Sequence, residues 1–237
     1  MSNVEELIRK SLQELQKISC ENKIKSHENN SKNEVKPQES KLIFPKYRDN
    51  SIRISEQEAR LLLIREIEKQ NEFYYSVETP TKNTYSDFSD KSENPKINPD
   101  GRSGNIDLTL YQKHENEFKR THLVEFKNKP KASCKKDFLK LLCDDENCGI
   151  NYYINIIKNS DNTKKGNLET TIKDLEISKY QEAVEYVFEK YESKVKSKLK
   201  IFVCILNDID ITENNIIEYQ IIDKENRSIK ELTERIK

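Results

Sequence analysis

Three ionisable residues lie in two short segments in which apolar and polar residues alternate. Asp107 lies in the first segment, and Glu125 and Lys127 lie two residues apart in the second. If the segments pair as an antiparallel hairpin whose turn is centred on Asn116, Asp107 faces Glu125, with the Cβ atoms about 4.5–5.5 Å apart. Directly opposed carboxylates repel each other, and a divalent cation is the natural group to neutralise them.

The period of a strand brings the lysine to the same place. Side chains two residues apart in a strand share a face, so Lys127 joins the two carboxylates. The apolar residues of the hairpin then point to the opposite face and supply its core: Ile106, Leu108, Val124 and Phe126. One register therefore explains both the chemical and the buried residues.

Hydrolysis of a phosphodiester bond suits this set of groups. A hard cation such as Mg²⁺ takes carboxylate oxygens as ligands, lowers the pKa of an attacking water and offsets charge in the transition state. Asp107 and Glu125 are the expected ligands, and Lys127 is expected to orient the water or to help deprotonate it. Mn²⁺ is an alternative cation. The sequence has no glycine-rich phosphate loop, so no nucleotide cofactor is expected.

The elements that position these residues follow from the hydrophobic periodicity. The sequence predicts helices over residues 3–18, 56–69, 137–142 and 170–198. It predicts strands over residues 73–77, 105–111, 121–127, 150–157, 200–206 and 216–222. Ser55 and Glu58 form a capping box for the second helix. Pro80 is expected to end the first strand, and residues 81–104 to form a long loop. The result is a mixed α/β domain.

Residues 104–107 (Gly-Asn-Ile-Asp) and 124–127 (Val-Glu-Phe-Lys) together resemble the Asp…Glu-x-Lys signature of the PD-(D/E)xK superfamily of nucleases. The resemblance implies a restriction-endonuclease-like core of order α-β-β-β-α-β, with a mixed sheet flanked by helices. It implies Mg²⁺-dependent cleavage of nucleic acid, most often DNA, in restriction, phage defence or repair. Many members also have a metal-binding glutamate on the first core helix, for which Glu58 is favoured over Glu66. The proline that often precedes the aspartate is replaced here by Ile106.

Basic residues beside the signature are candidates for contact with a nucleic-acid backbone. They are Arg102, Lys129, Lys131, Lys135 and Lys136. Solvated surface charge is the simpler explanation of such a cluster. Because 42 Lys and Arg residues balance 42 Asp and Glu residues, binding would depend on a local groove rather than on bulk charge. The residues do not distinguish DNA from RNA.

The chain is predicted to have three parts. Residues 1–20 form an amphipathic helical arm, residues 21–42 a flexible linker, and residues 43–237 the nuclease-like domain. The arm would bind a protein partner or a second copy in a homodimer, unless the helix simply folds back onto the domain. An odd number of cysteines and the lack of an apolar run of about 20 residues predict a cytoplasmic protein without membrane contact.

Two other interpretations fit the same residues. In the first, the chain is a nuclease fold that has lost catalysis and only binds nucleic acid or docks to a larger complex. Alternatively, Asp107, Glu125 and Lys127 are a solvated sheet face with an exposed salt bridge. An intact set of two carboxylates and a lysine favours the enzyme.

Overall fold

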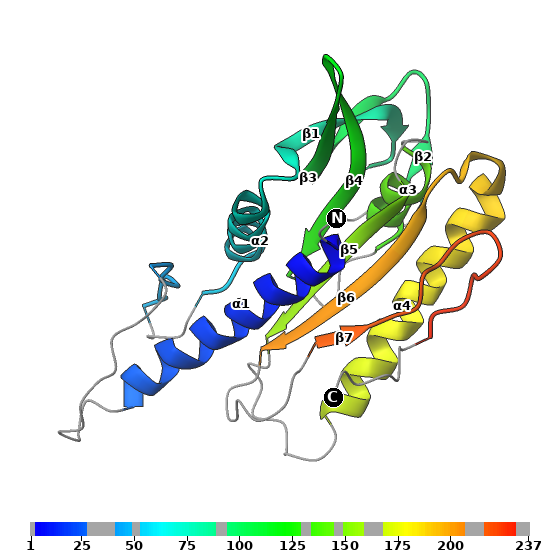
Figure 1. Ribbon diagram of the computed structural model, residues 1–237. Coiled ribbons are helices and arrows are strands. Elements are labelled where there is room, and N and C mark those ends of the chain that lie inside the picture. Colours follow the sequence, from blue (N-terminus) through cyan, green and yellow to red (C-terminus); the bar gives the residue numbers. More distant parts are fainter. Residues whose placement is uncertain are drawn as a thin grey trace.

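The computed structural model describes residues 3–27, 41–48, 53–88, 94–128, 134–144, 149–158, 168–206 and 216–230. Its helices are α1 (Val4–His27), α2 (Glu56–Gln70), α3 (Lys135–Cys143) and α4 (Leu168–Tyr191), which a short 3₁₀ turn, η1 (Glu192–Lys194), extends (Figure 1). Its strands are β1 (Tyr74–Ser86), β2 (Lys96–Ile97), β3 (Arg102–His114), β4 (Glu117–Lys127), β5 (Ile150–Lys158), β6 (Lys198–Leu206) and β7 (Ile216–Glu218).

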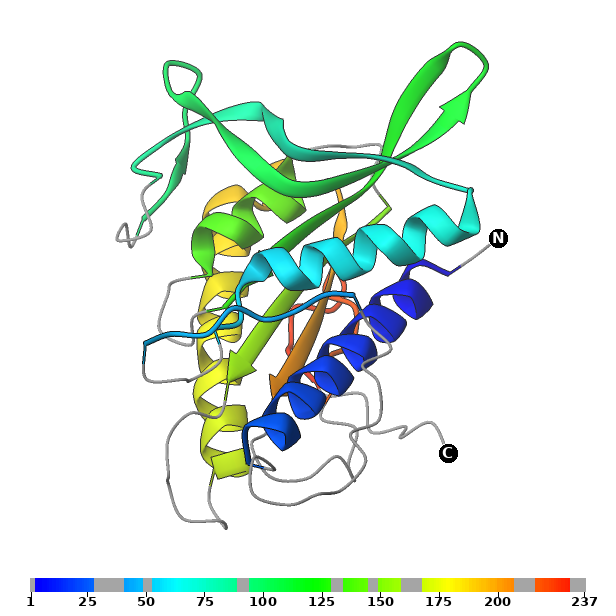
Figure 2. The ribbon, with the colours of Figure 1, turned by 90° about the vertical axis from the view of Figure 1, so that its left-hand side faces the viewer.

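The strands form one mixed sheet between two layers of helices. The strand order is β2-β1-β3-β4-β5-β6-β7, with β4, β5 and β6 parallel and the remaining pairs antiparallel. Helices α1 and α2 cover one face, and α3 and α4 cover the other (Figure 2). The predicted α/β class is therefore confirmed. None of the described helices combines the length and the apolar character that a bilayer crossing requires.

Helix α1 is part of the domain core. Its apolar stripe is at most 4% exposed and packs in one cluster with α2 and the sheet: Val4, Leu7, Ile8, Leu12, Leu15 and Ile18. Arg9 and Lys200 also share the carboxylates of Glu5 and Glu218, which ties α1 to β6 and β7.

The prediction of a separate arm is therefore wrong, because the stripe that would bind a partner is buried within the chain. The alternative, a helix that folds back onto the domain, is the one observed. The helix also continues to His27, into the predicted linker, and residues 28–40 of that linker lie outside the described residues.

Strand β1 is longer than the sequence predicts. It continues through Pro80, which lies opposite Asn105, and ends at Ser86 after an irregularity between Pro80 and Thr84. Proline is tolerated at such a bulge because the ladder there needs no donor from it. The buried carboxylate of Asp144 accepts hydrogen bonds from the backbone N–H groups of Lys82 (3.1 Å) and Asn83 (2.8 Å). The predicted loop over residues 81–104 therefore contains the end of β1, β2 and the start of β3.

The β3–β4 hairpin has the predicted register next to the proposed site. Leu108 lies opposite Val124, and Leu110 opposite His122. A bulge between Leu110 and Tyr111 shifts the register of the outer half by one residue, which the prediction missed. Leu108, Val124 and Phe126 are core residues as predicted, in the same cluster as residues of α1 and α2.

Ile106 is an exception to the predicted alternation. It packs in the opposite cluster, with residues of α3 and α4. The regular pleat of β3 is therefore interrupted at Asp107, between Ile106 and Leu108.

Candidate active site

Strands β3 and β4 separate at Asp107. The last regular pair of the ladder is Leu108 with Val124. Beyond it, Asp107 Oδ2 accepts a hydrogen bond of 2.7 Å from the backbone N–H of Phe126, a donor that a regular ladder pairs with a main-chain carbonyl. The Asp107 carboxylate is thus fixed at the point where the two strands part.

The other neighbour of β3 is irregular at the same level. Glu78 of β1 lies between the pairs Val77–Leu108 and Thr79–Ile106 and has a φ of 50°, in the left-handed region. This conformation costs a non-glycine residue roughly 1–2 kcal/mol, and such strain is concentrated at functional sites. Arg60 of α2 compensates, because its Nη1 donates to Glu78 Oε1 (2.6 Å) and to the Asp107 carbonyl (3.2 Å).

Helix α3 fills the gap between the separated strands with Lys140. Its Nζ donates to the Asn105 carbonyl on β3 (2.9 Å) and to Glu125 Oε1 on β4, and lies 3.2 Å from Asp137 Oδ1. An ammonium group has three donors, and here three acceptors surround it. Only 3% of the Lys140 side chain is exposed. Burial alone would lower the pKa of Lys140, but Glu125 and Asp137 outweigh it and raise that pKa.

Asp137 lies between the two lysines. Its Oδ1 faces Lys140, and its Oδ2 lies 3.5 Å from Lys127 Nζ. Oδ2 is buried and makes no hydrogen bond. Burial alone would raise the pKa of Asp137, but Lys140, Lys127 and Lys136 lower it, so this carboxylate is held ionised. Glu125 and Lys127 both reach α3, which places them on one face of β4.

The remaining carboxylates of the site are electrostatically strained. Burial raises the pKa of Glu125 well above its ordinary value, and Asp137 and Asp107 add to this against the attraction of Lys140. Burial also raises the pKa of Asp107, although the Phe126 N–H and Lys140 oppose it. A further positive charge at the site would stabilise the ionised form of both carboxylates.

The glutamate of α2 that takes part in this site is Glu56. Burial raises the pKa of Glu56, Lys127 lowers it and Asp107 raises it. Both charged groups therefore lie close enough to act on the Glu56 carboxylate. Its Oε1 accepts the backbone N–H of Asn128 (3.0 Å), the residue after β4.

Glu58, the predicted metal ligand, has another role. Its Oε2 accepts from the Ser55 backbone N–H (2.7 Å), as the capping box requires, and also from the Ser55 hydroxyl. The alternative, Glu66, pairs with Lys69 at 2.6 Å. The capping box was predicted correctly, and the helix residue next to the site is Glu56 instead.

The charges and donors at this site fit a divalent cation. Four carboxylates (Glu56, Asp107, Glu125 and Asp137) face two ammonium groups (Lys127 and Lys140), which leaves two negative charges in excess when all six are ionised. All the candidate ligand atoms are carboxylate oxygens, which Mg²⁺ prefers. In the described residues no three Asp, Glu, His or Cys side chains are already arranged around one metal position, and Lys140 lies between two of the carboxylates.

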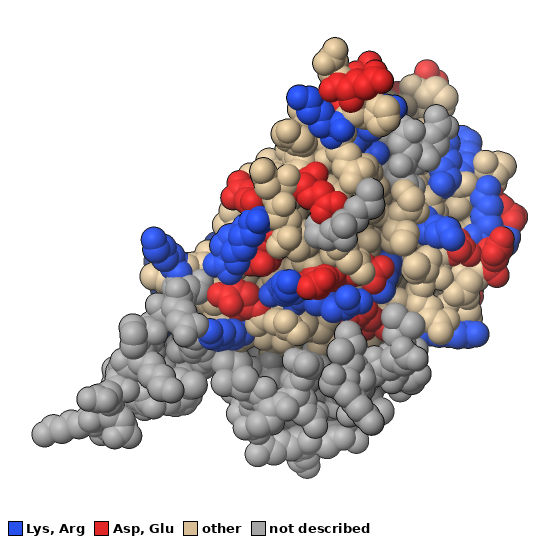
Figure 3. Space-filling view, in the orientation of Figure 1, with Lys and Arg blue, Asp and Glu red and all other residues tan. Residues whose placement is uncertain are grey.

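The predicted basic residues are only partly near this site. Lys136 acts on the charge of Asp137 and lies 5.3 Å from the Phe88 ring centroid, whereas Lys135 pairs with Glu182 at 2.6 Å. Arg102 is exposed at the start of β3. Lys129 and Lys131 lie outside the described residues. Basic and acidic side chains are intermixed on the face shown in Figure 3.

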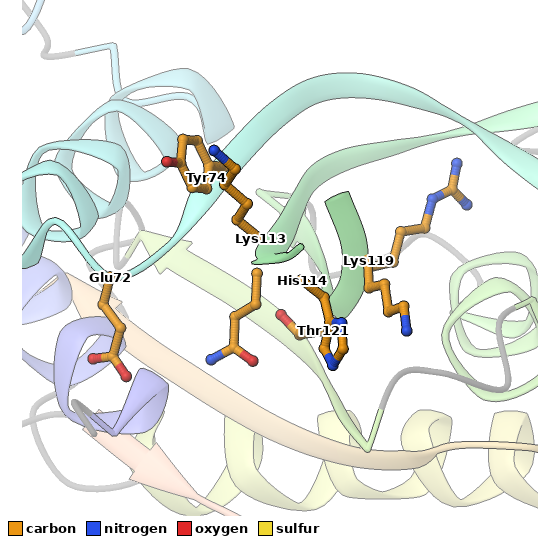
Figure 4. A pocket seen from close by; sticks show the side chains of 8 residues that line it. Glu72, Tyr74, Lys113, His114, Lys119 and Thr121 are labelled. Carbon is orange, nitrogen blue, oxygen red and sulfur yellow. The ribbon is translucent and has the colours of Figure 1, made fainter. Parts of the chain in front are cut away.

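A separate cleft of about 490 Å³ lies on the β3–β4 hairpin (Figure 4). It is lined by Glu72, Tyr74, Gln112, Lys113, His114, Lys119, Arg120 and Thr121. None of the proposed metal ligands lines it, and Glu72 offsets part of its positive charge. The cleft is therefore distinct from the place where β3 and β4 separate.

Sequence reasoning missed three residues of the site: Glu56, Asp137 and Lys140. The signal for the last two was present, since a helix was predicted from residue 137 and residues three apart share a helix face. Glu56 has no comparable signal in the sequence, where the capping box singles out Glu58.

Comparisons of the chain with protein-family models, with curated proteins and with solved structures gave no match.

Proposed function

We propose that this chain is a nuclease that uses a divalent cation, Mg²⁺ or Mn²⁺, to hydrolyse phosphodiester bonds of DNA. The observation that carries the proposal is that the Phe126 N–H, between Glu125 and Lys127 on β4, fixes the Asp107 carboxylate of β3 where the two strands separate. These residues match the Asp…Glu-x-Lys signature described above, and buried carboxylates with raised pKa values are typical of functional sites.

The order of elements supports the same proposal. From α2 to β5 the chain runs α2, β1, β3, β4, α3, β5, apart from the two-residue strand β2. This agrees with the α-β-β-β-α-β order of restriction-endonuclease-like cores. Strand β5 lies parallel to β4 after the α3 crossover, so helix α3 is placed directly beside Glu125. The fold leaves the biological role open among restriction, phage defence and repair.

Asp107, Glu125 and Glu56 are the residues that would hold the cation. When bound, the cation would supply an activated water and positive charge at the phosphate. The Phe126 N–H orients Asp107, and the Asn128 N–H orients Glu56, so backbone groups at the end of β4 fix two of the three carboxylates.

Lys127 is the lysine that would act on water or substrate. Its side chain is 16% exposed, whereas that of Lys140 is 3% exposed and surrounded by protein acceptors. A group must reach the reacting atoms to position or deprotonate a water, and only the partly exposed lysine meets this requirement.

Buried free thiols at Cys134, Cys143 and Cys204 favour a reducing compartment, which leads us to propose the cytoplasm.

Lys127→Met is expected to lower cleavage by about 10²-fold or more, as for loss of a general acid–base group. The assay measures cutting of single- and double-stranded DNA, with RNA in parallel, in Mg²⁺, Mn²⁺ or EDTA. Lys198→Met, at an exposed lysine of β6, is the control and should cut like the wild type. No cutting by wild type with any cation would refute the proposed nuclease activity and favour a binding role. Cutting by Lys127→Met at the wild-type rate would refute the assigned site.

Glu56→Gln is expected to reduce cleavage and to raise the Mg²⁺ concentration needed for half-maximal rate. Glu58→Gln is a closely matched control on the same helix, because glutamine also completes a capping box. A Mg²⁺ titration of the cleavage rate distinguishes Glu56→Gln from Glu58→Gln. If Glu58→Gln is the variant that needs more Mg²⁺, the assignment of Glu56 is wrong.

A further inference from the structure

Asp137 and Lys140 form a second pair of charged residues beside Glu125 and Lys127. The β4 residues are two apart on a strand, and the α3 residues are three apart on a helix, so each pair shares a face. The contacts run from Glu125 to Lys140, from Lys140 to Asp137, and from Asp137 to Lys127. Negative and positive groups therefore alternate along this chain of four.

We propose that Lys140 is a positioning residue that fixes the Glu125 carboxylate for the cation, and that Asp137 fixes Lys127 in the same way. The inference rests on the proposed function and deepens it. Helix α3 therefore supplies the second half of the site. Lys140 and Asp137 act through Glu125 and Lys127 and do not touch the substrate.

The surroundings of Lys140 are those of a fixed group. Its three acceptors come from β3, β4 and α3, so it bridges the elements that meet where the strands separate. A buried ion pair is a weak source of stability, because desolvation offsets the attraction, but it restricts the orientation of both partners. The contact uses Oε1 of Glu125, and we assign Oε2 to the cation.

Asp137 lies between the two lysines and contacts both. Its Oδ1 is taken by Lys140, while its buried Oδ2 makes no hydrogen bond and has Lys127 Nζ at 3.5 Å. An orphaned buried carboxylate oxygen is costly unless a charge compensates it. The charge that compensates it here is Lys127, so Asp137 restricts where that ammonium group can lie.

Positioning and simple electrostatics predict opposite effects of removing Lys140. Coulomb's law alone predicts that loss of an ammonium group beside a divalent cation tightens cation binding. Loss of a group that orients a ligand instead weakens binding, typically by about 10–100-fold. The sign of the change therefore decides between the two.

The test is Mn²⁺ affinity, measured by calorimetry on the full chain without nucleic acid. Lys140→Met is expected to bind Mn²⁺ about 10–100-fold more weakly than wild type. Lys200→Met is the matched control, since Lys200 is another buried lysine, 6% exposed, that pairs with Glu5 and Glu218 between α1 and the sheet. This control should lose stability but keep the wild-type affinity.

Unchanged or tighter Mn²⁺ binding by Lys140→Met would overturn the role of Lys140. If that variant does not fold, the Mn²⁺ affinity of Lys140→Arg tests the role of Lys140 instead. Arginine keeps the buried positive charge but moves its N–H donors to other positions. Lys140→Arg should still bind Mn²⁺ at least about tenfold more weakly, and wild-type affinity would overturn the proposal. Absence of Mn²⁺ binding by wild type would instead overturn the proposed function itself, and this inference with it.

Asp137→Asn tests the second half of the proposal. At saturating Mn²⁺ it is expected to lower kcat by about 10-fold or more while KM for DNA stays unchanged, because Lys127 is displaced and the substrate contacts are kept. A wild-type kcat in Asp137→Asn would show that Lys127 needs no partner on α3.

Discussion

Asp107→Asn is expected to stabilise the metal-free protein and, at the same time, to abolish most of its cleavage. The pKa of Asp107 is raised mainly by burial, so the ionised carboxylate is less favourable in the folded chain than in the unfolded chain. Asparagine removes this charge and keeps an oxygen that can accept the Phe126 N–H. Cleavage should fall by about 10²- to 10³-fold, which corresponds to the loss of several kcal/mol of transition-state stabilisation.

The stability effect has a definite dependence on pH. Because the folded pKa of Asp107 lies above its ordinary value of 3.8, the penalty is absent at lower pH and develops as pH rises through the folded pKa. Asp107→Asn should therefore match wild type near pH 3 and exceed its melting temperature at pH 7–8. Each kcal/mol corresponds to a shift of about 2–4 °C for a chain of this size.

Thermal unfolding in EDTA across this pH range is the measurement. Asp100→Asn, at an exposed aspartate before β3, is the control for removal of one charge and should melt like wild type at every pH. Addition of Mg²⁺ should stabilise wild type and leave Asp107→Asn unchanged. A variant that is less stable than wild type at pH 7–8 would show that Asp107 stabilises the fold instead of straining it.

Leu12→Ala is expected to destabilise the domain by about 2–5 kcal/mol, the usual cost of truncating a fully buried leucine. Leu12 is 1% exposed on α1 and belongs to the cluster shared with α2 and the sheet. Leu61→Ala on α2 is the matched control, because Leu61 is 52% exposed, and it should change stability by less than about 0.5 kcal/mol.

Urea unfolding of both variants measures these free energies. If Leu12→Ala is as stable as wild type, α1 is not part of the core in solution, and the arm predicted from the sequence is correct after all. Cleavage by Leu12→Ala at low temperature, where the variant remains folded, should be close to wild type, since Leu12 is not among the residues of the site.

The sequence predicted the hairpin best where local periodicity decides the outcome. Alternation within two strands was sufficient to predict that Leu108 lies opposite Val124 and that both belong to the core. The bulge after Leu110 was not predictable from that alternation, because the extra residue changes the pairing without changing the apolar pattern.

The predictions failed where contacts between distant segments decide the structure. Pro80 was expected to end β1, but the Asp144 carboxylate, about sixty residues away, satisfies the donors of the irregular segment that follows. The stripe of α1 was recognised correctly, yet an amphipathic helix looks the same whether its apolar face meets a partner or its own domain. The role of Lys140 depends on a gap between strands that no local pattern encodes.

The pairing of α1 with β6 and β7 also affects how the domain must form during synthesis. Arg9 reaches Glu218, so a partly buried ion pair joins residues 209 positions apart. A ribosome releases α1 first, and its apolar stripe can meet α2 early but lacks β6 and β7 until those strands emerge. Such long-range closure slows folding, because the entropy of a large loop must be lost before the contact forms. The nascent chain is therefore expected to remain open to chaperones until its last strands are made.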